Sequence, residues 1–131
     1  QILALTAELA RYPLTGDFEL SAQGRSKVCG STMELGLDLD REGRIARVGM
    51  QVVACAIGQS SAAIMAGAIS GRSAAEMRLV LERAASWLTG KSQAPDWPGF
   101  EKLEPAVEHA GRHGALLLPW ETAVKALSST S

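Results

Sequence analysis

The sequence contains few of the residues that mark specialised classes of protein. Its 131 residues include two cysteines and two histidines, and aromatic residues make up only 5%. Two cysteines are too few for a disulfide-stabilised miniprotein, and no paired CxxC motif indicates a structural zinc site. No run of about 18 apolar residues is present, so we expect no membrane-spanning helix.

Net charge is also low, because 13 basic and 14 acidic residues give −1 at pH 7. Nucleic-acid binding needs a concentrated basic surface, so we expect no nucleic-acid partner. The 47% hydrophobic content excludes intrinsic disorder. The length predicts a single domain over residues 1–131. No targeting segment is visible, which favours a cytoplasmic protein with reduced thiols.

The first half of the chain has the alternating pattern of β-strands. Apolar and polar or small residues alternate over 33–39 and again over 48–52, and the turn signal at 40–43 joins the two segments as a hairpin. Residues 17–28 supply a further strand, since Phe18 and Leu20 alternate with polar neighbours. These segments predict a three-stranded antiparallel sheet.

The second half has the pattern of helices. Residues 60–69 predict a buried helix, and residues 73–88 predict a helix that begins with a Ser-Ala-Ala-Glu capping box. The last helix is predicted over 120–127, with Pro119 at its first position, and residues 2–10 predict a short N-terminal helix. Strands followed by helices indicate an α+β domain whose helical C-terminal half packs on one face of the sheet.

Both cysteines lie where predicted strands end. Cys29 lies between the first two strands, and Cys55 lies between the last strand and a helix N-terminus. The free amides and dipole of a helix N-terminus favour a thiolate. Two thiolates brought together by a hairpin suit a soft metal such as Zn²⁺ or an iron–sulfur cluster. The alternative is that each cysteine is only a small hydrophobic side chain.

The residues around both cysteines resemble the IscU/NifU-type iron–sulfur cluster assembly scaffolds. The segment from Gly90 to Gly111, ahead of the last helix, is similar to that of the SufU branch. The matching stretches are Cys29-Gly30, Glu42-Gly43-Arg44-Ile45, Ala54-Cys55-Ala56-Ile57-Gly58-Gln59-Ser60-Ser61-Ala62, Gly71-Arg72-Ser73 and Arg112-His113-Gly114-Ala115-Leu116-Leu117-Leu118-Pro119-Trp120.

This resemblance implies the IscU/NifU fold and a scaffold function rather than an enzymatic one. Such scaffolds receive sulfur from a cysteine desulfurase, build a [2Fe–2S] cluster and pass it to apo-proteins. The partners implied here are therefore a cysteine desulfurase and apo-iron–sulfur proteins. The residues implied as ligands and persulfide acceptors are Cys29 and Cys55.

The chain departs from the family pattern at two ligand positions. Ser31 stands where the family has an aspartate, and Ala115 stands where it has a third cysteine. A tetrahedral zinc ion or a [2Fe–2S] cluster takes four protein ligands, or three and an open position. Two replacements are open. His113 could supply an imidazole ligand, or two chains could share one cluster as a homodimer.

Other readings of the sequence remain open beside the scaffold hypothesis. A degenerate family member could bind partners such as the desulfurase without holding a cluster. A cysteine hydrolase with Cys55 as nucleophile is disfavoured, because no orienting residue or oxyanion motif accompanies it. We expect His109 to be a solvated surface residue, and Arg112 to form a surface ion pair. We expect Trp87, Trp97 and Trp120 to be core or loop anchors, and of the three Trp97 is the one that could instead face a partner.

Overall fold

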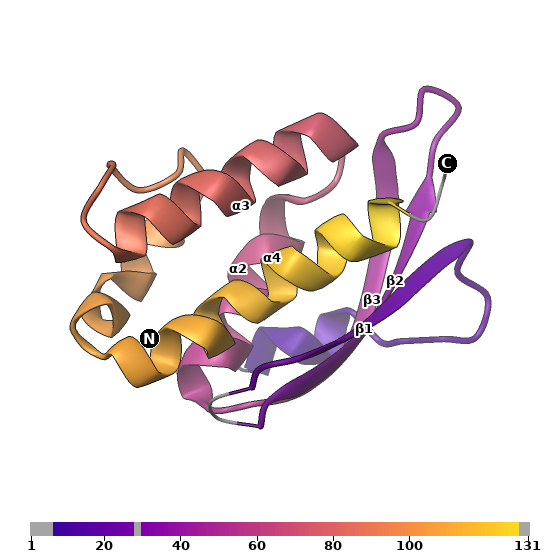
Figure 1. Ribbon diagram of the computed structural model, residues 1–131. Helices are drawn as coiled ribbons and strands as arrows, with labels where there is room; N and C mark the ends of the chain where they lie inside the picture. The colour runs from indigo at the N-terminus through magenta and orange to yellow at the C-terminus, as the bar shows by residue number, and fades with distance from the viewer. Residues whose placement is uncertain (1–6, 28–29, 129–131) are drawn as a thin grey trace.

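The computed structural model describes residues 7–27 and 30–128. Figure 1 shows helices α2 and α4 lying across one face of a three-stranded sheet, with α3 packed outside them. The elements, in chain order, are η1 (Leu9–Arg11), β1 (Leu20–Arg25), β2 (Thr32–Leu39), β3 (Ile45–Val53), α2 (Ala56–Ala68), α3 (Ala74–Leu88), η2 (Phe100–Glu108), η3 (Ala110–Arg112) and α4 (His113–Ser128). This arrangement confirms the predicted α+β class.

The sheet is antiparallel throughout, with strand order β1-β2-β3. Its alternation places Met33, Leu35 and Leu37 on the inner face, where each is at most 2% exposed. The turn between β2 and β3 is held by Asp40, whose carboxylate accepts hydrogen bonds from the backbone amides of Glu42 and Arg44, both at 2.9 Å. The predicted hairpin is therefore confirmed.

The outer face of the sheet is partly covered by the segment that precedes β1. Gly36 and Gly49 are cross-strand partners on β2 and β3, and the ring of Phe18 lies over both. A β-carbon on Gly36 would lie 2.5 Å from Cγ of Phe18, so only glycine leaves room for the ring. The amide of Met50 donates to the carbonyl of Tyr12 at 2.9 Å, which holds this segment beside β3.

The inner face is covered mainly by helices with small residues. All the residues of α2 from Ser60 to Ala66 are buried, as expected for a helix in the core. The helix begins at Ala56, directly after Cys55, one turn earlier than the apolar pattern predicts. The predicted capping box of α3 is confirmed, because the Glu76 amide donates to Ser73 Oγ at 3.1 Å and the Ser73 amide donates to the Glu76 carboxylate at 2.9 Å.

The prediction for the start of the last helix is wrong. Helix α4 begins at His113, so Pro119 lies inside it rather than at its first position. Proline has no amide to bond with the carbonyl four residues earlier, which here belongs to Ala115. The helix continues because its buried side packs tightly, and Ser61 Oγ on α2 donates to the next carbonyl, that of Leu116, at 2.6 Å.

The expectation that Trp97 is an anchor is confirmed, since its side chain belongs to the core, and the alternative of a partner-facing ring is wrong. It is 3% exposed, and its indole Nε1 donates to the carbonyl of Ile64 at 2.9 Å. Its ring stacks edge-on against Trp120 with centroids 4.8 Å apart, while the guanidinium of Arg72 lies 4.2 Å from its centroid. Because the ring contacts other residues on all these sides, it has no surface left for a partner.

Two further expectations concern the ends of the chain and the membrane. The predicted N-terminal helix falls mostly on residues 1–6, outside the described residues, and its described part ends as the 3₁₀ turn η1. Within residues 7–27 and 30–128, no helix is both long and apolar enough to cross a membrane.

Candidate functional site

Cys55 is an exposed thiol at the junction between β3 and α2. It is the N-cap residue of α2, with extended backbone angles of φ −67° and ψ 172°. Its side chain makes no capping hydrogen bond, and the first turn of α2 contains no acidic residue. The backbone is held by Gln59, whose amide donates to the Cys55 carbonyl at 3.0 Å and whose side chain donates to the Ala54 carbonyl at 2.8 Å. The thiol therefore stands free at the positive end of a 13-residue helix.

The second predicted site residue, Cys29, lies outside the described residues, as does Val28. The described residues on either side are joined, because the Ser26 amide donates to the Ser31 carbonyl at 2.8 Å and the Gly30 amide donates to the Ser26 carbonyl at 3.1 Å. Ser31, at the position of the family's aspartate, is only 4% exposed.

The N-terminus of α4 packs against both of these segments, and a glycine lies at each contact. A β-carbon on Gly114 would lie 2.8 Å from Ser26 Oγ, which places this end of α4 against the β1–β2 turn. A β-carbon on Gly58 would lie 3.4 Å from Cβ of Ala115, which places the same end of α4 against the first turn of α2. The three segments predicted to form the site therefore meet at one end of the sheet.

Ala115, which the sequence resemblance aligns with the family's third cysteine, lies at this meeting point. Its side chain is 1% exposed and offers only a methyl group. Sequence reasoning identified Ala115 but missed Gly58 and Gly114 as the residues that allow the close approach. A glycine in an early helical turn destabilises the helix relative to alanine. Its presence there is therefore the sequence signal that another segment packs closely at that position.

His113 is partly buried at the start of α4, and its Nε2 lies 2.9 Å from the carbonyl oxygen of Val107. A carbonyl only accepts, so Nε2 carries the proton, and in the neutral ring Nδ1 is an acceptor. A metal held by His113 would therefore be bound through Nδ1. His109 is exposed, as expected. The ion pairs found between described residues do not include Arg112, so its expected ion pair is not seen.

The donor set does not fit a four-ligand metal or cluster. No group of three or more His, Cys, Asp or Glu side chains suited to a metal ion occurs within the described part of the chain. Adding Cys29 to Cys55 and His113 gives three donors at most, and both departures from the family pattern place non-ligands at buried positions. A structural zinc site is closed by four.

Comparison with solved structures identifies the same architecture elsewhere. The N-terminal part of a nitrogen-fixing NifU-like protein from Brucella abortus matches with a TM-score of 0.86 and 26% identity over 99% of this chain and 93% of that one. A putative iron–sulfur cluster assembly scaffold protein for the SUF system from Fervidobacterium islandicum AW-1 matches with a TM-score of 0.85 and 21% identity over 96% and 93%.

A hypothetical protein has the same fold at a TM-score of 0.70 and 20% identity, over 97% of this chain and 96% of that one. No protein-family model and no curated relative matches the sequence. Neither of the two named neighbours is described as an enzyme. The chain has the fold of the NifU-like and SufU scaffold proteins, which confirms the resemblance seen in its sequence.

Proposed function

We propose that this chain acts in iron–sulfur cluster assembly as a cytoplasmic, single-domain protein that binds a cysteine desulfurase without holding a cluster of its own. The fold of its neighbours supports the role in assembly. The observation that supports the absence of a bound cluster is Ala115, which puts a buried methyl group where a third thiol would add to the ligand set. Ser31, only 4% exposed, removes the fourth ligand in the same way.

A thiol remains available for chemistry at the same end of the sheet. Cys55 is exposed and precedes a helix with no acid in its first turn. A partner that normally meets a scaffold at its thiols therefore still finds one here. The chain therefore keeps the surface of a scaffold but lacks the ligands that would hold an assembled cluster.

The second candidate function is metal or cluster binding through the reduced donor set, followed by transfer to apo-proteins. The hydrogen bond from His113 to Val107 favours it, because a backbone carbonyl that orients the imidazole through one nitrogen is typical of metal-ligating histidines. Zinc or a [2Fe–2S] cluster would then be held by Cys29, Cys55 and His113, or by the thiols of two chains.

Anaerobic affinity purification of the tagged chain distinguishes the two functions. We expect a cysteine desulfurase to co-purify, while iron, zinc and acid-labile sulfide each remain well below one per chain. A Cys55→Ser variant is the control for the thiol. Near-stoichiometric iron and sulfide, or zinc, that is lost in this variant would establish the second function instead. Absence of the desulfurase would contradict the proposal as a whole.

A further inference from the structure

The outer face of the sheet is uncovered by described residues at the end nearest Cys55. Phe18 covers the far end, over Gly36 and Gly49. Towards Cys55 follow two cross-strand rows of side chains that alternate with the inward-facing residues of the core. The first row is Gln23, Glu34 and Gln51, and the second is Arg25, Thr32 and Val53.

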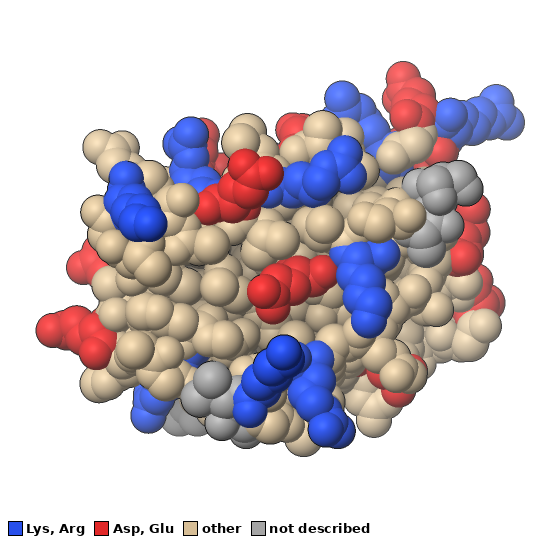
Figure 2. Space-filling view, in the orientation of Figure 1, with Lys and Arg blue, Asp and Glu red and all other residues tan. Residues whose placement is uncertain are grey.

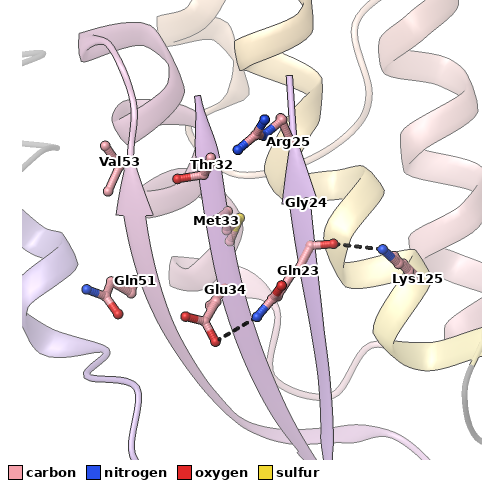
Figure 3. Close-up of a pocket in the computed structure, with 9 residues that line it drawn as sticks. All are labelled: Gln23, Gly24, Arg25, Thr32, Met33, Glu34, Gln51, Val53 and Lys125. Carbon is pink, nitrogen blue, oxygen red and sulfur yellow. Dashed lines mark hydrogen bonds between the residues drawn. The ribbon is translucent and has the colours of Figure 1, made fainter. Parts of the chain in front are cut away.

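These two rows line a shallow hollow of about 570 Å³ (Figure 3). The Gln23 side chain donates to the Glu34 carboxylate at 3.4 Å across its floor, and Lys125 of α4 donates to the carbonyl of Gln23 at 2.9 Å from the β1 side. Most of the lining side chains are exposed, whereas a small-molecule site encloses most of its ligand. The hollow therefore suits a segment of a protein.

The chemistry of the hollow indicates what kind of segment it fits. Val53 is 64% exposed, and among the large hydrophobic side chains of the described residues only Leu79 on α3 is similarly exposed. Arg25 and Lys27 are exposed cations at the adjoining turn, and none of the ion pairs between described residues involves either. Glu34 is the acidic side chain that lines the hollow, and the Gln23 amide binds it.

The β1–β2 turn, which adjoins the hollow, lies at a basic edge of the molecule. In Figure 2, acidic and basic side chains are mixed over the face formed by α3 and α4, whereas basic side chains gather at the lower edge, beside the β1–β2 turn. Charges of one sign next to an exposed apolar side chain favour a partner of opposite charge with an apolar anchor.

We propose that an acidic, extended segment of the desulfurase partner docks in this hollow. An apolar side chain of the segment packs on Val53, and its carboxylates face Arg25 and Lys27. Because Val53 lies two residues before Cys55, a segment seated here brings the adjoining part of the partner to the thiol. The inference rests on the proposed function and specifies the surface through which it is performed.

The test is the dissociation constant of the full chain for a purified cysteine desulfurase, measured by calorimetry at low and high salt. We expect Val53→Ser and the double variant Arg25→Glu, Lys27→Glu to weaken binding by roughly tenfold or more, as hot-spot residues do. The double variant should also reduce the salt dependence of binding. The matched controls are Leu79→Ser and Arg78→Glu on α3, which we expect to stay within about twofold of the wild type.

The outcomes separate this inference from the proposal on which it rests. If the wild type binds and the hollow variants bind equally well, the docking surface is wrong while the proposed function stands. Equal weakening of hollow and control variants also overturns it. A wild type that binds no desulfurase overturns both. Self-association of the wild type, lost in Val53→Ser by light scattering, would assign the hollow to a second copy of this chain. Circular dichroism melting checks that each variant folds.

Discussion

Gly58 and Ala115 face each other where α2 meets α4, so closely that a β-carbon on Gly58 would lie 3.4 Å from that of Ala115. This contact places the first turn after Cys55 directly beside Ala115, the residue that the sequence resemblance aligns with a third cysteine. The segments that carry Cys55 and Ala115 therefore lie together, and the methyl group of Ala115 cannot bind a metal. The effect of adding a ligand at Ala115 can therefore be tested by experiment.

Replacing Ala115 with cysteine should create a metal site. Ala115→Cys adds a third thiol beside the first turn after Cys55, and three ligands with an open position are enough for zinc. We expect zinc affinity to rise by roughly tenfold or more, measured by competition with a chromophoric chelator. Ala123→Cys, equally buried in α4, is the control and should bind zinc no better than the wild type. Equal zinc affinity of the two variants would show that Ala115 does not face a competent site.

Alanine should have opposite effects at the two glycines of α2, because only one of them has a close neighbour. Gly58→Ala would place a β-carbon 2.8 Å from Cβ of Ala54 and should destabilise the fold by about 1–3 kcal/mol. Gly67→Ala meets nothing within 4 Å and should stabilise it by about 0.5–1 kcal/mol through helix propensity. Urea unfolding followed by circular dichroism measures both. A neutral Gly58→Ala would mean that Ala54 moves aside to admit the added methyl group.

The buried hydroxyl of Ser61 joins α2 to α4. Its Oγ donates to the Leu116 carbonyl at 2.6 Å and accepts from the Trp120 indole at 2.8 Å. Ser61→Ala leaves a buried donor and a buried acceptor without that partner, so we expect a loss of about 2–3 kcal/mol in the free energy of unfolding. Ser128→Ala, whose exposed hydroxyl bonds to the Val124 carbonyl, should cost less than about 0.5 kcal/mol.

Glu76 makes the stability of the fold dependent on acid pH. The Ser73 amide, and then the guanidinium of Arg44 at 3.0 Å, hold the pKa of this carboxyl below its usual range. Since the folded-state pKa is depressed, the stabilisation is complete above the unfolded pKa and is lost as pH falls through the folded value.

Wild type should therefore be more stable than Glu76→Gln near pH 7, and the difference should shrink below about pH 4. Denaturant unfolding at a series of pH values measures it. Glu82→Gln, an exposed change on the same helix, controls for removal of a negative charge. A difference that is constant with pH would show that the hydrogen bonds do not depend on ionisation.

Most of the fold could be predicted because its patterns are local. The alternation over β2 and β3, the capping box at Ser73 and the small residues of α2 each carry a direct structural signal. The exceptions are residues whose environment is set by distant contacts. Pro119 has the sequence signature of a helix start, but packing against α2 extends α4 six residues further back. Trp97 lies in a polar loop, yet the Ile64 carbonyl and Trp120 hold it in the core.

The site could be predicted only in part for the same reason. Cys55 and Ala115 can be identified from their neighbours in sequence. That they lie close together depends on packing at Gly58 and Gly114, which are separated by more than fifty residues. The hollow on the outer face could not be foreseen, because it arises from the register of three strands and from where Phe18 stops covering them.

The contact between Lys125 and the carbonyl of Gln23 limits how a partner can approach. Strand β1 is an edge of the sheet, and Lys125 places an ammonium group beside it. A charged side chain at a sheet edge opposes the addition of a further strand, since the incoming backbone would have to displace it. Strand addition is therefore disfavoured at the β1 edge, and a partner that approaches from this side is directed across the face of the sheet.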